Sequence, residues 1–269
     1  MKNTFLLYIL LITIIFSSCK TPNILLTEEL QKEAVPMEVK GRQGFRIHQV
    51  LTYGGFKTGR VKRGWVSAGN IQFVLNFQKA KEKFQFKQFT PDSTASAMVY
   101  AVGKFESTSF DFFRGRSNWK MDIGLNYQNT FAGTIIPVQS KDNSWEFIVY
   151  NPESSFADKG DCGFAKDKLG NEIKIIPVKQ LEGQRNWINY TNFGFEFHYK
   201  NTAIAAVSVL NNGRVWIDPS IPSTLQMVVS SMTSAILLRS NLEQAAHNNS
   251  LNNPINSPSN HGGGPQHHR

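Results

Sequence analysis

The sequence predicts a mainly β protein, an antiparallel barrel or sandwich of about ten or more strands with one apolar C-terminal helix packed against or inside it. Short segments in which apolar and polar residues alternate recur from residue 37 to residue 217, and this period of two is typical of half-buried strands. Turn-forming residues such as Gly54-Gly55 and Asn211-Asn212-Gly213 separate the segments. After Pro222 the apolar residues recur every three or four positions, which indicates a helix.

Residues 1–18 have the features of an export signal. Lys2 supplies a positive charge, and Phe5 to Phe16 form an apolar run shorter than the roughly 20 residues of a membrane-spanning helix. Ser17 and Ser18 precede Cys19, and this arrangement resembles the lipobox of bacterial lipoproteins. The resemblance implies cleavage before Cys19, attachment of acyl chains such as palmitate to that cysteine, and stable membrane anchoring. The alternative is a plain secretory signal in which Cys19 is incidental.

The residues after the cysteine indicate location and domain boundaries. Lys20 does not resemble the Asp that marks inner-membrane retention in some bacteria, so we expect the outer membrane. Residues 19–36 are expected to be the lipidated cysteine and a tether, with a short helix over Thr27 to Ala34. Residues 37–242 then form a single β-rich domain, because 41% hydrophobic residues and 20 Phe are enough for one sizeable core.

The clearest alternation lies in the first half of this domain. Ile71, Phe73, Leu75 and Phe77 alternate with mostly polar neighbours, which predicts a strand. This strand is expected to form a hairpin with 84–87 across the charged turn 79–83. Further strands are predicted at 98–102, 119–125, 145–150, 173–178, 193–199, 203–210 and 215–217.

The helix predicted after Pro222 lacks a charged face. Leu225, Val228, Met232 and Ile236 follow the helical period, and no charged residue occurs from 219 to 238. A surface helix normally has a charged face, so we expect this one to be buried on most sides. A second membrane span and a membrane-surface helix are the alternatives. The six Ser and Thr residues between 223 and 234 lower the hydrophobicity that a span needs, and a surface helix would carry Lys or Arg, which are absent before Arg239.

The C-terminal part of the domain also carries a family resemblance. The strand 203–209, the segment Val215-Trp216-Ile217-Asp218-Pro219 and the apolar helix resemble the end of the tubby-like domain, including its LURP-one and phospholipid-scramblase relatives. In that family a closed antiparallel barrel surrounds a hydrophobic C-terminal helix, so the resemblance implies an enclosed helix here. It covers about residues 193–242, and no lipid-binding motif of the family matches residue by residue. A plain sandwich with a C-terminal helix has the same periodicities.

Residues 243–269 are expected to form a disordered tail. They consist largely of Asn, Ser, Pro, Gly and His and show no apolar period, so they cannot bury enough apolar surface to offset the entropy of ordering. The tail contains four of the six histidines. We interpret these as part of a solvated tail and not as a metal site.

The chain is basic, with a formal net charge of +9 and a pI near 9.5. Because the protein is expected to be exported, we predict no nucleic-acid partner. Anionic lipid headgroups or another acidic envelope surface suit this charge better. A stretch that combines cations with an aromatic ring is the candidate patch for such a ligand. It comprises Arg42, Arg46, Lys57, Arg60, Lys62, Arg63 and Trp65. Alternatively, these cations only solvate the outer face of their strands.

Signatures of catalysis are mostly missing, and we expect neither a cofactor nor a metal site. His198 shares one face of its predicted strand with Glu196, and we interpret the two as a surface pair. Cys162 lacks an intrachain partner if Cys19 is lipidated, and it is expected to be a packing or loop residue. We therefore predict a non-catalytic binding or structural module of the envelope. The alternative is an envelope hydrolase whose site assembles from dispersed residues such as Asp111, Asp122, Glu146, Cys162 and His198.

Overall fold

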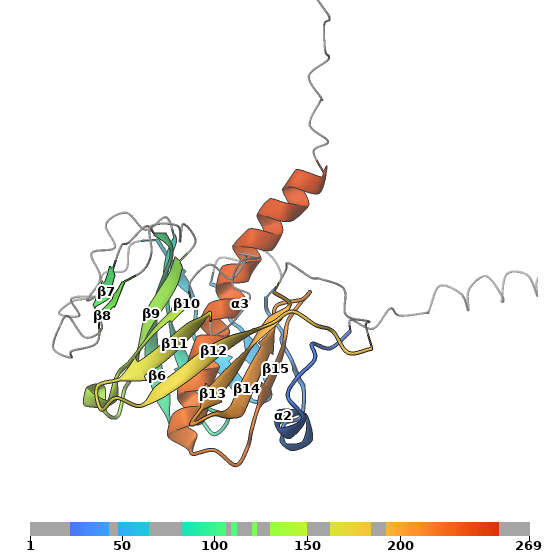
Figure 1. Cartoon of the computed structure of the whole chain (residues 1–269). Coiled ribbons are helices and arrows are strands. Elements are labelled where there is room, and N and C mark those ends of the chain that lie inside the picture. Colours follow the sequence, from blue (N-terminus) through green and yellow to red (C-terminus); the bar gives the residue numbers. More distant parts are fainter. Residues whose placement is uncertain are drawn as a thin grey trace, which may run out of the picture.

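The computed structural model describes residues 22–42, 48–64, 82–105, 109–111, 120–122, 130–149, 162–183 and 192–252. Within these ranges, 13 strands form one antiparallel sheet (Figure 1). Its strands are β1 (Met37–Glu38), β2 (Thr52–Tyr53), β3 (Phe56–Thr58), β4 (Lys62–Arg63), β5 (Glu82–Phe89), β6 (Ser96–Phe105), β9 (Thr130–Pro137), β10 (Trp145–Val149), β11 (Gly163–Asp167), β12 (Glu172–Val178), β13 (Gly194–Tyr199), β14 (Thr202–Ser208) and β15 (Arg214–Ile217). A separate ribbon pairs β7 (Ser109–Asp111) with β8 (Lys120–Asp122).

The sheet curls until its two edges almost meet. Its strands follow the order β1-β15-β14-β13-β12-β11-β10-β9-β6-β5-β3-β2, with β4 beside β5. Next to the edge strands, Lys40 N donates to the carbonyl of Thr52 at 2.9 Å, and Thr52 N donates back to the carbonyl of Lys40 at 3.1 Å. The result is a nearly closed barrel, which confirms the predicted fold class and selects the barrel over the sandwich.

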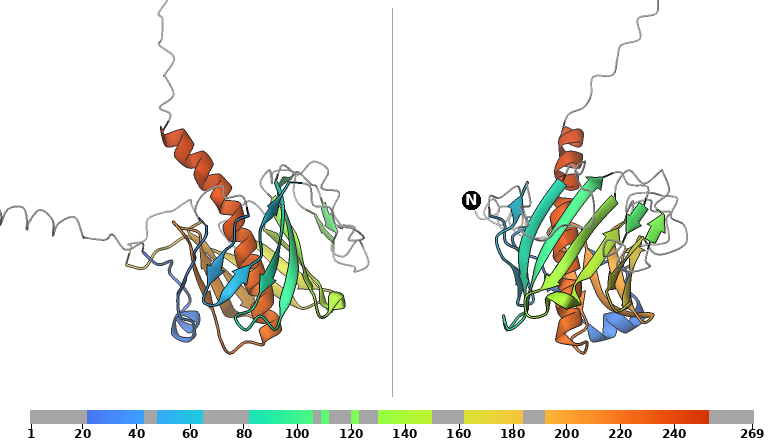
Figure 2. Two further views of the ribbon diagram at one scale, coloured as in Figure 1. Left: turned by 180° about the vertical axis from the view of Figure 1, so that it is seen from behind. Right: turned by 90° about the vertical axis from the view of Figure 1, so that its left-hand side faces the viewer.

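Helix α3 (Ser223–Asn252) runs through the middle of this barrel (Figure 2). Every residue from Met227 to Arg239 is buried, and the helix packs against inward-facing aromatic rings that include Phe84, Phe131 and Phe147. The predicted burial of the uncharged helix is therefore confirmed. The helix continues to Asn252, beyond the predicted end at residue 242, so residues 243–252 are helical and only 253–269 of the predicted tail lie outside the described residues.

A buried polar contact connects the helix to the barrel wall. The Tyr53 hydroxyl on β2 donates to the carbonyl of Ser230 at 2.8 Å, and its oxygen also lies 2.8 Å from Oγ of Ser234. Ser234 donates to Oε1 of Gln88 on β5 at 2.8 Å. Burial raises the pKa of Tyr53 above its ordinary value of 10.0. Because these polar groups are buried, they must pair with one another, which favours one rotation and height of the helix in the barrel.

The segment before β1 packs against the outside of the barrel, where a free tether had been expected. Its helix α2 (Glu28–Glu33) lies within the helix predicted over 27–34. Ile24, Leu26 and Leu30 are buried in an outer cluster that includes Leu181 and Trp216. The expectation of a spacer is therefore wrong for residues 22–36, because their apolar side chains gain more from burial than from extension into water.

Most predicted strands agree with the structure. Strands β6, β10, β12, β13, β14 and β15 cover most of the segments predicted from residue 98 onward, and the Gly54-Gly55 turn has the expected positive φ angles of 51° and 88°. Individual segments were not predicted for β1, β2, β3, β4, β7, β9 and β11. The strand expected at 71–77 and most of 119–125 lie outside the described residues.

Candidate functional site

The structure divides the predicted basic patch. Arg42 is only 1% exposed, and its Nη1 donates to the carbonyls of Val209 at 2.8 Å and Asn211 at 2.9 Å. Burial lowers the pKa of Arg42 to about 10. Arg63 is half-buried and donates from Nη2 to Oε1 of Gln49 at 3.1 Å. Arg42 is buried against backbone carbonyls of the barrel, so it does not belong to a surface patch for a ligand, and its inclusion is corrected, whereas Arg63 stays partly exposed.

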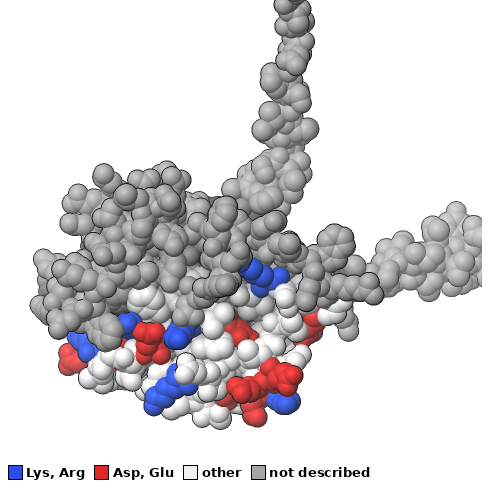
Figure 3. All heavy atoms as spheres, viewed as in Figure 1, with Lys and Arg blue, Asp and Glu red and all other residues white. Residues whose placement is uncertain are grey.

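The other cations of the patch remain at the surface. Lys57, Arg60 and Lys62 are exposed, and Lys57 Nζ lies 5.5 Å from the centre of the Phe89 ring. Arg46 and Trp65 lie outside the described residues. On the face shown in Figure 3, described cationic and acidic side chains are interspersed, so the described part of that face does not form a single cationic patch.

The two candidate catalytic residues lie on opposite faces of the sheet. Cys162 belongs to the core inside the barrel, and its Sγ donates to the carbonyl of Ile175 at 3.5 Å. His198 lies on the outer face with Nε2 at 2.9 Å from Oε2 of Glu196. Glu196 is 4% exposed and also accepts from Thr27 N at 2.7 Å. The His–Glu pair is thus real but covered by the N-terminal segment, which corrects the expectation of a surface pair.

The carboxylates of the hydrolase alternative are also dispersed. Asp111 and Asp122 belong to the β7–β8 ribbon, whereas Glu146 is on β10 and buried. In the described part of the chain, His, Cys, Asp and Glu side chains do not form a group of three or more that could hold a metal ion. No helix among these residues is long and apolar enough to cross a membrane.

A groove of about 610 Å³ opens at the end of the barrel where α3 begins. Four strand connections and the start of the helix surround it: β5–β6, β9–β10, β11–β12 and β13–β14. Its apolar lining comprises Ala95, Pro137, Trp145, Leu169, Tyr199, Ile221, Pro222, Leu225, Met227 and Val228. Leu169 is 83% exposed, so a large apolar side chain stands at the edge of the groove in contact with water.

Polar side chains shape the rim of this groove. Asp167 accepts from the backbone amides of Leu169 at 2.9 Å and Asn171 at 2.8 Å, which fixes the β11–β12 turn. The Tyr199 hydroxyl donates to Oδ1 of Asn171 at 3.2 Å. Lys200 is the one cation among the described residues that line the groove, and its Nζ lies 5.3 Å from the centre of the Tyr199 ring.

This arrangement has the properties of a small-molecule site. Ligand pockets in proteins have volumes of roughly 300–1,000 Å³, with mostly apolar walls and a few placed polar groups. The groove fits this range, with apolar residues of α3 and the strand ends at its base and amides, hydroxyls and Lys200 at its rim. Sequence reasoning missed it because its residues come from turns spread between Thr94 and Val228.

Comparisons of the chain with protein-family models, with curated proteins and with solved structures find no match. Function must therefore be argued from the geometry. The relevant features are a barrel around a buried helix, a groove at one end, and an N-terminal segment packed on the outer face.

Proposed function

We propose that this chain is a lipid-anchored protein of the cell envelope, held in the outer membrane by acyl chains on Cys19. Its barrel would be a non-catalytic binding module for an anionic amphiphile, such as a long-chain carboxylic acid or an anionic lipid. The groove at the start of α3 is the observation that carries this proposal. The export and lipobox residues 1–19 support the anchor, and the tubby-like resemblance agrees with a barrel around a C-terminal helix.

The chemistry of the groove favours an amphiphile over a sugar or a nucleotide. Trp145, Leu225 and Val228 present apolar surface, against which an alkyl chain leaves water favourably. Lys200 at the rim offers one ammonium to a carboxylate or phosphate. Hydrolysis is not favoured, because the chain places Cys162 inside the barrel and His198 outside it.

Replacement of Cys19 tests the anchor. The Cys19→Ala variant should remain soluble after cell lysis, because without acyl chains the export signal has no stable hold on the bilayer. Sedimentation of the wild type and the variant with membranes measures this. Continued membrane association of the variant would contradict lipid anchoring at Cys19.

Replacements in the groove test the binding module. We expect the purified protein to bind dodecanoate in calorimetry, and the Thr224→Trp variant, which fills the groove from the first turn of α3, to lose this binding. Lys200→Gln should weaken the affinity for dodecanoate by up to about fivefold, because an exposed ion pair contributes up to ~1 kcal/mol. The affinity for uncharged dodecanol should not change. Lys62→Gln, at an exposed site away from the groove, is the matched control. Equal dodecanoate affinity in Thr224→Trp and wild type would exclude the groove as the site.

A further inference from the structure

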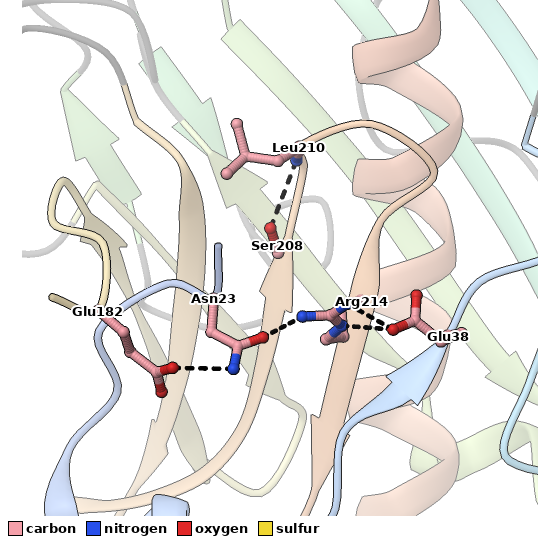
Figure 4. A network of polar contacts seen from close by, with 6 residues as sticks. All are labelled: Asn23, Glu38, Glu182, Ser208, Leu210 and Arg214. Atoms are coloured by element: carbon pink, nitrogen blue, oxygen red, sulfur yellow. Dashed lines mark hydrogen bonds and ion pairs between the residues drawn. The ribbon is translucent and has the colours of Figure 1, made fainter. Parts of the chain in front are cut away.

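The N-terminal segment is fixed to the barrel from its first described residues. Asn23 donates from Nδ2 to Oε2 of Glu182 at 2.8 Å and accepts from Arg214, which also donates to Oε1 of Glu38 at 2.7 Å (Figure 4). The backbone contributes as well, since Leu25 N donates to the carbonyl of Gln180 at 2.9 Å. These bonds tie residues 23–25 to two elements that lie far away in the sequence.

Apolar burial continues the attachment further along the segment. Ile24 is fully buried, and Leu26 and Leu30 are 6% and 1% exposed. They pack with Trp216 on β15 and with Val178 on β12 in the outer cluster. The segment therefore moves with the barrel and does not act as a flexible linker.

This attachment limits how far the barrel can lie from a lipid on Cys19. Only two residues, Lys20 and Thr21, separate Cys19 from Pro22. Consecutive Cα atoms are about 3.8 Å apart, so the Cα of Cys19 lies within about 11 Å of the Cα of Pro22 in any conformation. An acylated Cys19 must therefore bring this part of the barrel to the membrane surface.

The same end of the barrel carries exposed cations. Arg42 contacts the β14–β15 turn at Asn211, and its own carbonyl accepts from Nε2 of Gln49 at 3.2 Å. The carbonyl of Gln49 in turn accepts from Val61 N at 2.9 Å. We call the exposed residues at or next to this chain of hydrogen bonds, together with Pro22, the anchor rim. They are Pro22, Lys40, Arg60, Lys62, Asn211 and Asn212.

We propose that the anchor rim faces the membrane beside the end of α3, which projects beyond the barrel to Asn252, with Lys40, Arg60 and Lys62 toward anionic headgroups. The proposal rests on lipidation of Cys19, as proposed above. The groove would then open at the far end of the barrel. Strand β14 joins the two ends, since it runs from the Lys200–Asn201 turn beside the groove toward Asn211. Its 7 residues span about 23 Å at ~3.3 Å each.

Fluorescence quenching by lipids with a nitroxide on the headgroup tests this orientation. The full lipidated chain, in a Cys162→Ala background, is labelled at either Asn212→Cys on the anchor rim or Lys168→Cys beside the groove. Both sites are exposed. In vesicles of phosphatidylethanolamine and phosphatidylglycerol, we expect quenching at position 212 to exceed quenching at position 168 at least threefold. Insertion of 20 Gly and Ser residues between Thr21 and Pro22 should reduce this difference to the part that the anchor-rim cations maintain on their own.

The mass of the N-terminal peptide distinguishes the two ways in which the proposal can fail. A peptide without acyl chains on Cys19 would refute the anchor and the orientation together. An acylated peptide with equal quenching at positions 212 and 168, or with stronger quenching at 168, would refute the orientation alone. An unchanged difference after the linker insertion would show that the short connection to Pro22 does not set the orientation.

Discussion

Tyr53 is the residue at which the barrel wall and the enclosed helix share a hydrogen bond. Its hydroxyl contacts Ser230 and Ser234, and the latter reaches Gln88 on a second strand. Burial raises the pKa of Tyr53, so the folded protein holds the phenol proton more tightly than the unfolded chain. The resulting stability is fully present below about pH 10, and it is lost as the pH rises above that value.

We expect Tyr53→Phe to lower the free energy of unfolding by ~1–2 kcal/mol at pH 7, because buried acceptors lose their donor. The variant should also lose less stability than wild type between pH 9 and pH 11. Part of the pH dependence of stability should remain, because burial also raises the pKa of Tyr100. Chemical denaturation at several pH values measures both effects. Ser231→Ala is the control, because Ser231 donates only within its own helix, to the carbonyl of Met227. Identical pH dependence in Tyr53→Phe and wild type would contradict the assignment.

The fate of Arg42 illustrates what sequence reasoning lacks at the residue scale. A cation beside aromatic residues gives the same sequence pattern whether its side chain binds a ligand or binds backbone carbonyls of its own chain. Arg42 does the second, at the turn after β14. Its sequence neighbours give no sign of this, because Val209 and Asn211 lie far along the chain and meet Arg42 only through the pairing of β1 with β15.

At the scale of elements, helix α2 and the residues before it form a cover over the outer face of the sheet. Ile24 and Leu26 alternate, and Leu30 and Ala34 are one helical turn apart. That spacing is a signal of packing that was present in the sequence, and the nearby export motif led to its interpretation as a tether. Strand β9 was missed for another reason, because its first four residues are all buried and therefore lack alternation.

Leu30→Ala should detach this cover without unfolding the barrel. Truncation of a buried Leu costs ~2–5 kcal/mol, and here the loss falls on a cluster outside the barrel. Tryptic cleavage at Lys32 should accelerate about 30-fold or more, since cleavage follows the population of the open form. Leu25→Ala, at a residue that is 44% exposed in the same segment, should have little effect. Loss of the whole fold in Leu30→Ala would mean that the cover and the barrel unfold as one unit.

At the scale of the whole molecule, the proposed membrane-facing cations lie at the end of the barrel from which the chain leads back to Cys19. The formal net charge of +9 did not indicate which cations face a partner. The structure removes Arg42 from that role, leaves Arg63 half-buried, and leaves Lys40, Arg60 and Lys62 exposed.

Vesicle binding by the soluble Cys19→Ala form measures this charge. Lys40→Gln, Arg60→Gln and Lys62→Gln together should weaken binding to phosphatidylglycerol vesicles by on the order of 100-fold at low salt, since each surface cation contributes ~1 kcal/mol. The difference should vanish near ~1 M salt, where the Debye length is about 3 Å. A matched triple variant at Lys32, Lys168 and Lys200, which are also exposed, should bind more tightly than the first. Equal weakening in both variants would show that only total charge matters.

The barrel and its enclosed helix were predictable, because period-two strands, turn residues and an uncharged apolar helix each have a distinct local pattern. The groove was not, because it exists only where four connections and the first turn of α3 meet. Which sheet face a segment covers, and which cations become buried, likewise depend on contacts between residues far apart in the chain.

The way the sheet closes also constrains the order of folding. Strand β1 pairs with β15 through Met37 and Val215, and α3, which fills the interior, follows β15 in the chain. Under the proposed export from the N-terminus, the first strand would remain without this partner until residue 215 has crossed the membrane. Because such distant contacts must form before the core is complete, folding is expected to be slow and to begin only after export is nearly finished. Until the barrel closes, its apolar strands stay exposed and prone to aggregation.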